Sequence, residues 1–261
     1  MALQFNHPKK LFLLDQDGTL YKGRNLFPFT LSFLKNIKES GASYLFITNN
    51  SSKTIEEYVT KMKRFGISTT IDEFYTSTSA TIDYLHKHHP RENVYLVATP
   101  AVINEFKQAG INVPVDPHQA TVAVLTYDTT LDYTKLTTLC ELVNNPKITY
   151  LATNPDLVCP TEDGYLPDCG SFAMMVFNAT GRNPLYLGKP RGLFVETILE
   201  RFDLKRDDVV IVGDRLYTDI ALGVNALVDT ILVLSGEATK EDLKSSPFAP
   251  TYVVEDISQI I

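Results

Sequence analysis

Two aspartates stand directly after an apolar run near the start of the chain. The run at residues 11–14, Leu-Phe-Leu-Leu, is followed by Asp15, Gln16, Asp17 and Gly18. Such a run predicts a strand buried on both faces of a parallel sheet, and open α/β sheets bind ligands at the carboxyl ends of their strands. If the chain stays extended, the two carboxylates point to the same side. At about 4 Å they would repel by roughly 4 kcal/mol at an effective dielectric of 20, so the pair predicts a bound cation or a shared proton.

The same residues could also form only a polar turn, because Asp and Gly are common in turns. A calcium loop of the EF-hand kind needs a glycine at its sixth position and a glutamate at its twelfth. Counted from Asp15, the glycine here is fourth and the twelfth residue is Leu26. Taken alone, the motif therefore leaves a turn and a ligand site as its two interpretations.

Two further apolar runs end in polar residues. The run at 43–47 leads into a Thr-Asn-Asn-Ser-Ser segment at 48–52, and the run at 209–212 leads into a Gly-Asp-Arg-Leu-Tyr-Thr-Asp segment at 213–219. Hydroxyls, amides and the first N–H groups of a helix suit a phosphate site, although helix capping or a turn would explain either segment alone. Three predicted strands that each end in polar residues favour a single ligand site at the edge of the sheet.

A lysine at position 189 lies between Gly188 and Pro190. The segment is not a Walker loop, because the GxxxxGK[ST] spacing is absent and proline occupies the hydroxyl position. Considered alone, Lys189 could be a surface residue.

The whole chain has the composition of a globular protein. Its 261 residues carry a net charge of −7, 44% are hydrophobic, and the size favours two domains. Nucleic-acid binding is disfavoured, since it depends on clustered Lys and Arg. We expect a cytoplasmic protein without a membrane span, because neither a signal-peptide layout nor an apolar run of about 20 residues is present. The three cysteines, without a CxxC pair, predict reduced thiols.

The order of apolar runs predicts an α/β fold with two domains. Strand and helix patterns alternate over the first 75 or so residues and return after residue 181, which indicates βαβ units and a parallel sheet. Between them, strands are predicted at 94–97, 122–125 and 148–152, separated by helical stretches and prolines. We predict a doubly wound, Rossmann-like core formed by residues 1–79 and 181–261, with an inserted α/β cap domain at residues 80–180. One large single sheet is the alternative.

These residues resemble the haloacid dehalogenase superfamily of phosphatases. DQDGTL at 15–20 is similar to the first motif of that family, DxDGT; Thr48 is similar to the second motif, Lys189 to the third, and GDRLYTD at 213–219 to the fourth. The resemblance extends over nearly the whole chain to the NagD-like subgroup, which has a large α/β cap between the second and third motifs. The segments ITNNSS at 47–52, ATNPD at 152–156 and TGRNPLYLGKP at 180–190 carry it.

The resemblance implies catalytic residues. Asp15 would attack phosphorus and form an aspartyl-phosphate, and Asp17 would protonate the leaving oxygen and then deprotonate water. Thr48 and the backbone N–H of Asn49 would bind phosphoryl oxygens, and Lys189 would neutralise negative charge.

The resemblance also implies a Mg²⁺ cofactor. Asp15, the carbonyl of Asp17 and Asp214 would bind the ion, and Asp219 would orient a water bound to it. In the cap, Asn154, Asp156 and Asp168 are candidates for substrate contact, although each could simply form a turn. The residue pattern Pro-Asp-Cys-Gly-Ser at 167–171 departs from the Pro-Gly-x-Gly-Ser of many subgroup members, so a substrate is not carried over. Arg182, Arg191 and Arg215 could contact anions or be surface charges.

The second aspartate separates two activities within the resemblance. Family dehalogenases lack it, because a leaving halide needs no proton, whereas this chain has Asp17. The sequence therefore predicts a Mg²⁺-dependent phosphatase that hydrolyses small phosphate monoesters such as sugar phosphates, nucleoside monophosphates or nitrophenyl phosphate. Its partner would be a small phosphorylated metabolite, with no nucleic acid and no membrane, and the protein would be a monomer or homodimer. The alternative is a binding or regulatory protein of low turnover that retains the phosphate and Mg²⁺ site.

Overall fold

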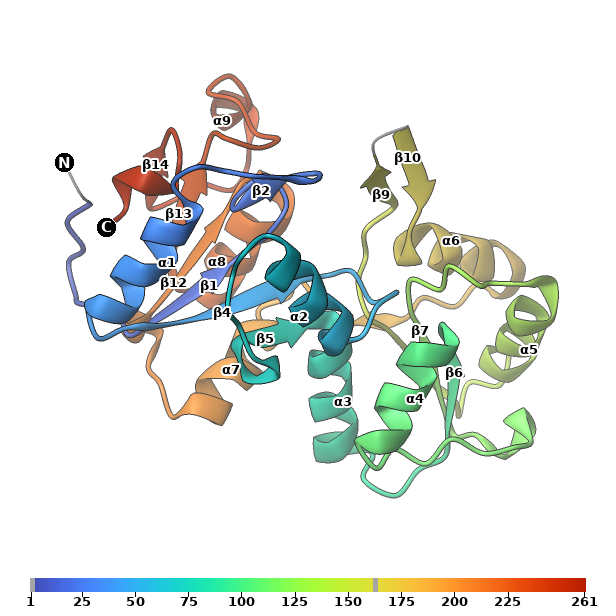
Figure 1. Cartoon of the computed structure of the whole chain (residues 1–261). Helices are drawn as coiled ribbons and strands as arrows, with labels where there is room; N and C mark the ends of the chain where they lie inside the picture. Colours follow the sequence, from blue (N-terminus) through green and yellow to red (C-terminus); the bar gives the residue numbers. More distant parts are fainter. Residues whose placement is uncertain (1–2, 162–163) are drawn as a thin grey trace. The chain divides into compact units, whose positions relative to one another are not determined.

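The computed structural model describes residues 3–161 and 164–261 (Figure 1). Contacts divide the chain into two compact units. The first unit comprises Met1–Thr48, Val59–Tyr75 and Lys189–Ile261, and the second comprises Asn49–Tyr58 and Thr76–Gly188. The chain therefore passes between the units four times, once within helix α2 (Ile55–Arg64).

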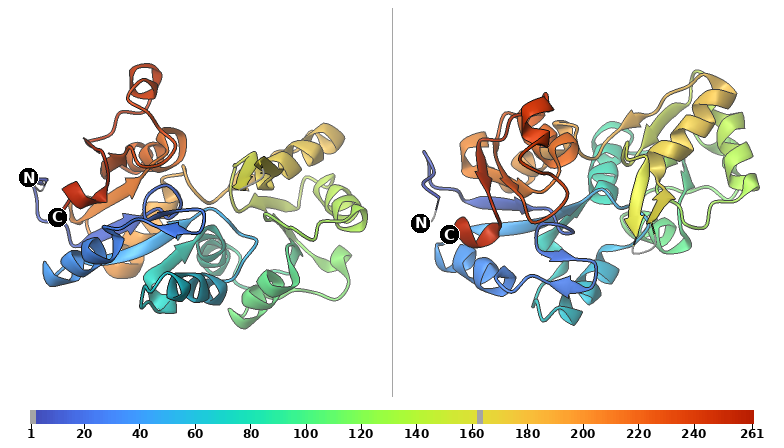
Figure 2. Two further views of the ribbon diagram at one scale, coloured as in Figure 1. Left: turned by 45° about the horizontal axis from the view of Figure 1, so that its top comes forward. Right: turned by 90° about the horizontal axis from the view of Figure 1, so that it is seen from above.

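A six-stranded sheet forms the centre of the first unit. Its order is β14-β13-β12-β1-β4-β5, and the strands from β14 to β4 run parallel. Helices lie on both sides of this sheet (Figures 1 and 2). The strands are β1 (Leu11–Leu14), β4 (Ser43–Thr48), β5 (Phe74–Thr76), β12 (Val209–Gly213), β13 (Asp229–Val233) and β14 (Tyr252–Val254).

The helices that cover the sheet are amphipathic. Helix α1 (Thr30–Glu39) buries Phe33, Leu34 and Ile37 and packs against β4, while α8 (Ala221–Ala226) packs against β13. This spacing of three and four residues places the apolar side chains on one face. The unit also contains α7 (Leu193–Phe202), α9 (Asp242–Ser245) and a small hairpin formed by β2 (Tyr21–Lys22) and β3 (Asn25–Leu26).

The second unit contains a parallel sheet of its own. The order is β11-β8-β7-β6, formed by β6 (Val94–Val97), β7 (Val122–Leu125), β8 (Thr149–Ala152) and β11 (Leu185–Tyr186). Its helices are α3 (Ser77–His88), α4 (Pro100–Gln108), α5 (Tyr133–Val143) and α6 (Cys169–Thr180). A separate antiparallel pair is formed by β9 (Val158–Thr161) and β10 (Gly164–Pro167).

The predicted α/β class with a doubly wound parallel core and a second α/β region is confirmed. The predicted domain boundaries stay a prediction, and contacts within the structure group some residues differently. Residues 181–188 were predicted in the core, but β11 pairs with β8 and is an edge strand of the second sheet. Residues 49–58 and 76–79 also group with the second unit, and the Ser77 hydroxyl donates a 2.6 Å hydrogen bond to the Asn49 carbonyl. The assignment of the two units as catalytic core and cap stays a prediction.

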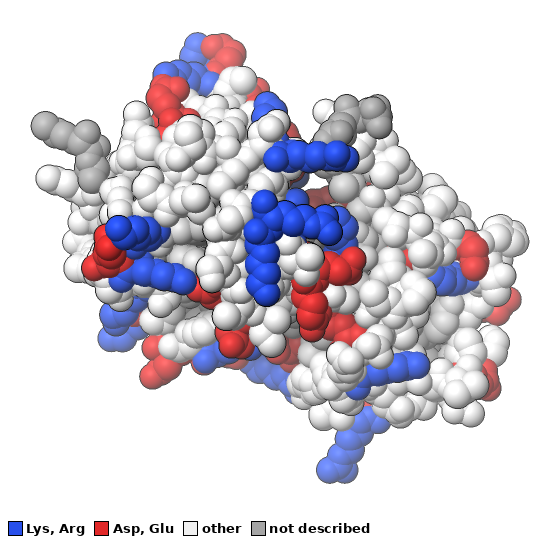
Figure 3. Space-filling model, viewed as in Figure 1, with Lys and Arg blue, Asp and Glu red and all other residues white. Residues whose placement is uncertain are grey.

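Charges of both signs are interspersed on the face of the molecule that Figure 3 shows. The chain carries a net charge of −7, and the absence of nucleic-acid binding stays a prediction. In the two described stretches of the chain, every helix is too short or too polar to cross a membrane.

Candidate active site

The order of the first sheet reverses between β1 and β12. From β1 the chain continues outward through β4 and β5, and from β12 it continues in the opposite direction through β13 and β14. Ligands of open α/β sheets bind outside the carboxyl ends of the strands at such a reversal. Leu14 pairs with Val212 in the register of the two strands, and the Asp15 N–H donates to the Val212 carbonyl at 2.9 Å. Asp15 and Asp214 therefore leave the sheet on adjacent strands.

A buried lysine joins two of the predicted aspartates. The Lys189 Nζ lies 2.6 Å from Asp15 Oδ1 and 2.7 Å from Asp219 Oδ1, and Lys189 is only 3% exposed. Burial of the ammonium group lowers the pKa of Lys189. The combined attraction of Asp15 and Asp219 outweighs this effect, so the pKa of Lys189 lies above its ordinary value. The ammonium group is therefore fixed beside Asp15 as a positive charge, and a surface position for Lys189 is excluded.

The carboxylates around this lysine are crowded. Asp15, Asp214 and Asp219 each place an oxygen within 4.8 Å of the others. Burial and the neighbouring Asp219 raise the pKa of Asp15 to about 6, while Lys189 opposes the shift. Burial, Asp15 and Asp219 raise the pKa of Asp214 to about 8. Like charges in a site of low polarity resist ionisation, so the cluster favours a bound proton or a cation.

The donor set suits a hard divalent cation. Asp214 is 2% exposed, and its Oδ2 accepts the backbone N–H of Glu237 at 2.8 Å. Its Oδ1 is buried and has no hydrogen-bond partner among the described residues. A buried carboxylate oxygen without a donor is costly unless a cation or a proton meets it, and Mg²⁺ prefers oxygen ligands of this type. The residues predicted to hold Mg²⁺ thus fit the ion.

A loop after β13, which was not predicted from the sequence, completes the walls of this cluster. The loop comprises residues 235–238. Ala238 donates its N–H to the Asp214 carbonyl at 3.1 Å, and the Ser235 hydroxyl donates to the Gly18 carbonyl at 2.8 Å. A Cβ atom at Gly18 or at Gly236 would overlap the Asp214 carboxylate. The signal was available, because the apolar run at 230–234 also ends in a polar, glycine-containing turn at the ligand edge.

The residues of the first motif alternate in exposure. Asp15 is half-buried, Gln16 is 3% exposed and Asp17 is exposed, as expected for an extended segment. The Tyr21 hydroxyl donates to Gln16 Oε1 at 3.1 Å, which holds this residue inside the fold. Gly18 then adopts a positive φ of 88°. The motif therefore leaves the Asp17 side chain accessible for proton exchange, and its role as acid and base stays a prediction.

The residues after β4 divide between the two units. Thr48 ends β4 in the first unit, whereas Asn49 belongs to the second unit. The Asn49 side chain donates from Nδ2 to Asp156 Oδ2 at 3.0 Å, so two residues predicted to contact substrate bind one another. Asn50 Oδ1 accepts the N–H and the hydroxyl of Ser52, the local turn that the alternative interpretation predicts. Phosphate binding by Thr48 and by the Asn49 N–H stays a prediction.

Arg215 adds a second positive charge near Asp15. Its Nε lies 2.9 Å from Glu237 Oε2, and its backbone N–H donates to Asp219 Oδ2 at 3.2 Å. Although burial lowers the pKa of Arg215, the carboxylate of Asp15, with Tyr217, Asp214 and Glu237, raises it overall. Arg215 therefore faces the acidic cluster.

The cap candidates Asn154 and Asp168 form a buried pair in the second unit. Asn154 Nδ2 donates to Asp168 Oδ1 at 3.0 Å, and Asp168 caps helix α6 by accepting the Cys169 N–H. Asn154 is 0% and Asp168 4% exposed. This arrangement agrees with the turn and cap interpretation, and substrate contact by either residue stays a prediction.

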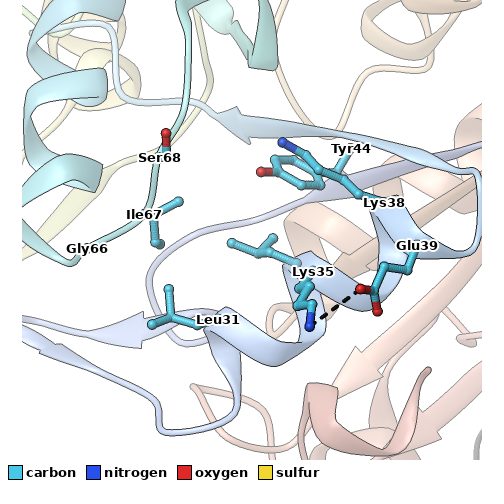
Figure 4. A pocket seen from close by; sticks show the side chains of 9 residues that line it. Leu31, Lys35, Lys38, Glu39, Tyr44, Gly66, Ile67 and Ser68 are labelled. Carbon is cyan, nitrogen blue, oxygen red and sulfur yellow. Dashed lines mark ion pairs between the residues drawn. The ribbon is translucent and has the colours of Figure 1, made fainter.

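A separate hollow of about 400 Å³ lies away from these residues (Figure 4). Helix α1, the start of β4 and residues 66–68 line it, mainly through Leu31, Leu34 and Ile67. Tyr44 lies beside it at the amino end of β4, whereas Thr48 is at the carboxyl end. The hollow lacks the carboxylate cluster described above and is not the candidate active site.

Comparison with known families and structures identifies this architecture. Residues 12–112 match the haloacid dehalogenase-like hydrolase family, and residues 186–260 match a HAD-hydrolase-like family. An acid sugar phosphatase of Staphylococcus saprophyticus is 34% identical over 97% of this chain and 96% of that protein. The 4-nitrophenylphosphatase structure of Thermotoga maritima is 38% identical, with a TM-score of 0.91 over 96% of this chain and 95% of that one. NagD of E. coli K-12 is 28% identical, with a TM-score of 0.90 over 98% and 99%.

The chain belongs to the haloacid dehalogenase-like hydrolases. Within that family it is a phosphoric monoester hydrolase of the NagD-like group, as the sequence predicts.

Proposed function

We propose that this protein hydrolyses small phosphate monoesters with Mg²⁺ as cofactor, through an aspartyl-phosphate on Asp15. The observation that carries the proposal is the ion pair between Lys189 and Asp15 inside a cluster of three aspartates at the reversal of the sheet. A carboxylate nucleophile and a fixed ammonium group are what phosphoryl transfer to a side chain requires.

Asp15 supplies the attacking oxygen. Its N–H is bonded to Val212 and its Oδ1 is bonded to Lys189, so both the backbone and the side chain are held before substrate arrives. As a phosphoryl group transfers to Asp15, Lys189 remains close enough to stabilise the added negative charge. Fixed charges of this kind act strongly because they need little reorganisation during the reaction.

Asp17 supplies and removes the protons. In the first half of the reaction it protonates the leaving oxygen, and in the second half it deprotonates the water that attacks the aspartyl-phosphate. Its exposed side chain is compatible with exchange of that proton with solvent between the two halves.

Asp15, Asp214 and the carbonyl of Asp17 would hold Mg²⁺, with Asp219 bonded to Lys189 behind them. The ion would offset the negative charge of the carboxylates and of a phosphate monoester, and it would favour the ionised form of Asp15. The buried Oδ1 of Asp214 supports this assignment.

The substrate class rests on the relatives. A similar protein is described as an acid sugar phosphatase and a similar structure as a 4-nitrophenylphosphatase, so sugar phosphates and nitrophenyl phosphate are the first compounds to test. Nucleoside monophosphates complete the panel, and a cytoplasmic location would give access to all the natural ones.

The test is phosphate release from this panel with Mg²⁺ and with EDTA, for the wild-type protein and for Asp15→Asn. Metal-dependent release that the Asp15→Asn protein lacks supports the proposal and ranks the substrates. A protein that keeps its fold and its turnover after Asp15→Asn would contradict Asp15 as nucleophile. Phosphate binding without release from any compound would favour the binding or regulatory alternative.

A further inference from the structure

Asn49 lies at the centre of a cluster of residues in the second unit, which we call the crossing cluster: Asn49, Ser77, Thr153, Asp156 and Gly188. Three of its members stand at or next to points where the chain enters or leaves that unit. Asn49 directly follows Thr48, Ser77 is the second residue after Tyr75, and Gly188 directly precedes Lys189. The cluster therefore holds the chain on either side of residues that we assign to phosphate binding.

Two polar groups of Asn49 engage different segments of the cluster. Its Nδ2 donates to Asp156 Oδ2 at 3.0 Å, and its main-chain carbonyl accepts the Ser77 hydroxyl at 2.6 Å. Asn49 is 6% exposed and Ser77 is 0% exposed. Hydrogen bonds of a buried amide to a carboxylate are among the stronger ones, so these contacts fix both the side chain and the main chain of Asn49.

Gly188 closes the cluster from the other side. Its N–H donates to the Thr153 carbonyl at 2.7 Å. A Cβ atom at this position would lie 2.5 Å from that carbonyl oxygen and 2.6 Å from Asn49 Oδ1. Only glycine permits this approach. Gly188, which directly precedes Lys189, therefore lies against the side-chain amide of Asn49.

Asp156 is itself anchored. Its main-chain carbonyl accepts the Gly170 N–H at 2.8 Å in the first turn of α6, where a Cβ atom would overlap Pro155. This hydrogen bond restrains the main chain of Asp156, and with it the carboxylate that accepts from Asn49.

From this arrangement we infer that Asp156 is a positioning residue for the phosphatase reaction. Through its hydrogen bond to Asn49 it fixes the main chain of Asn49, whose N–H is assigned to a phosphoryl oxygen, and it keeps Asn49 against Gly188. Thr48 and Lys189 directly adjoin Asn49 and Gly188 in the chain, so the cluster holds the main chain next to both of them. This inference rests on the proposed function and concerns the binding of the phosphoryl group, whatever the leaving group is.

The experiment compares Asp156→Ala and Asp156→Asn with the wild-type protein. The measurements are kcat and KM for nitrophenyl phosphate and for a sugar phosphate, the inhibition constant of inorganic phosphate, and Tm. For Asp156→Ala we expect KM and the phosphate inhibition constant to rise about tenfold, equally for both substrates, the scale seen when an orienting partner is removed. Asp156→Asn retains an oxygen that accepts from Asn49 and should recover most of this loss.

The matched control is Asp128→Ala. Like the half-buried Asp156, the buried Asp128 stands in a loop that follows a strand of the second sheet, and it pairs with Lys135 at 2.6 Å instead of with the crossing cluster. We expect Asp128→Ala to lower Tm while the phosphate inhibition constant stays within about twofold of the wild-type value, because its partner lies outside the cluster.

Three results would overturn the inference. In the first, Asp156→Ala leaves the phosphate inhibition constant unchanged but changes KM by different factors for the two substrates, which would place Asp156 at the leaving group. A lower Tm with unchanged kinetics would make its role structural only. If Asp156→Ala does not fold, Asn49→Asp should weaken phosphate inhibition, and adding Asp156→Asn should restore it; lack of restoration would also overturn the inference. Failure of the proposed function is recognised separately, as turnover that survives Asp15→Asn.

Discussion

Lys189 is the residue on which the candidate site depends most. Two short ion pairs, to Asp15 and Asp219, hold its buried ammonium group, and these two carboxylates lie in one cluster with Asp214. Removing one partner of a buried ion pair leaves an uncompensated charge, which costs several kcal/mol. Only the family resemblance indicated that Lys189 lies in the interior, because Lys189 and its two partners, Asp15 and Asp219, come from segments far apart in the chain.

A prediction at the residue scale concerns the proton donor. We expect Asp17→Asn to reduce turnover of a sugar phosphate much more than turnover of nitrophenyl phosphate, because nitrophenolate leaves with little protonation. Loss of general acid catalysis is expected to cost about 10²–10⁴-fold for the poor leaving group. The measurement is kcat for both substrates under saturating Mg²⁺. Equal losses for the two substrates would argue against Asp17 as the acid.

A second prediction at this scale concerns Glu105 on α4. Burial and the neighbouring Glu56 and Glu57 raise the pKa of Glu105 to about 7, and its buried Oε2 has no hydrogen-bond partner among the described residues. A carboxyl group with a raised pKa in the folded state stabilises the fold below its unfolded pKa of 4.5 and loses that contribution as the pH rises through 7.

Glu105→Gln removes this ionisation. We therefore expect the variant to gain stability relative to the wild-type protein between pH 5 and pH 8, by up to about 3 kcal/mol. Urea unfolding at the two pH values measures the difference. Asp83→Asn on α3 is a control for loss of one negative charge. A stability difference that does not change with pH would show that Glu105 ionises normally.

At the scale of elements, apolar runs located most of the strands correctly. The predicted strands at 11–14, 94–97 and 122–125 agree with β1, β6 and β7. These elements are buried, and their patterns reflect that burial directly. Short elements such as β2, β3 and β14 were not predicted, because two or three residues carry no periodic pattern.

Pairing between elements was harder to predict than their existence. Residues 181–188 were placed in the core, and nothing in the composition of β11 indicates that it pairs with β8. Within the site, the aspartates and the lysine could be predicted from their motifs. Gly236 and the Glu237 N–H could not be singled out in this way, because they act through the backbone, and a backbone contact leaves little trace in residue type.

The prediction at this scale concerns the loop after β13. Gly236→Ala places a Cβ atom into the Asp214 carboxylate, so we expect it to lower the free energy of unfolding by about 1–3 kcal/mol and to weaken Mg²⁺ binding. Calorimetric titration with Mg²⁺ and urea unfolding measure the two effects. Glu237→Ala is the matched control, because the backbone N–H that donates to Asp214 remains. Wild-type Mg²⁺ affinity in Gly236→Ala would separate this loop from the metal site.

At the scale of the whole molecule, four chain crossings link two units that each have a parallel sheet. Three of the proposed catalytic side chains, Asp15, Lys189 and Asp214, belong to the first unit, whereas Asn49, Asn154, Asp156 and Asp168 belong to the second. The side chains proposed to carry out the chemistry thus belong to the first unit, and the residues predicted to contact the substrate, Asn154, Asp156 and Asp168, belong to the second.

The last prediction joins the acidic cluster to the stability of the molecule. The pKa is raised to about 6 for Asp15 and to about 8 for Asp214. Without a cation, the two groups therefore stabilise the fold fully only at a pH below 3.8, the pKa of an aspartate in the unfolded chain. That contribution is lost as the pH rises through 6 and then through 8, because the ionised carboxylates repel. A cation that binds the ionised cluster must displace these protons, so its binding strengthens over the same range.

We therefore expect Mg²⁺ to raise Tm more at pH 8.5 than at pH 5.5, and EDTA to reverse the effect. A Mg²⁺ concentration 100 times its Kd would stabilise the folded protein by about 2.7 kcal/mol. The measurement is Tm as a function of Mg²⁺ concentration at both pH values, for the wild-type protein and for Asp214→Asn. The variant should show little Mg²⁺ dependence at either pH, since it lacks one of the carboxylates assigned to the ion. A Mg²⁺ effect of equal size at both pH values, or one that survives Asp214→Asn, would place the ion outside this cluster.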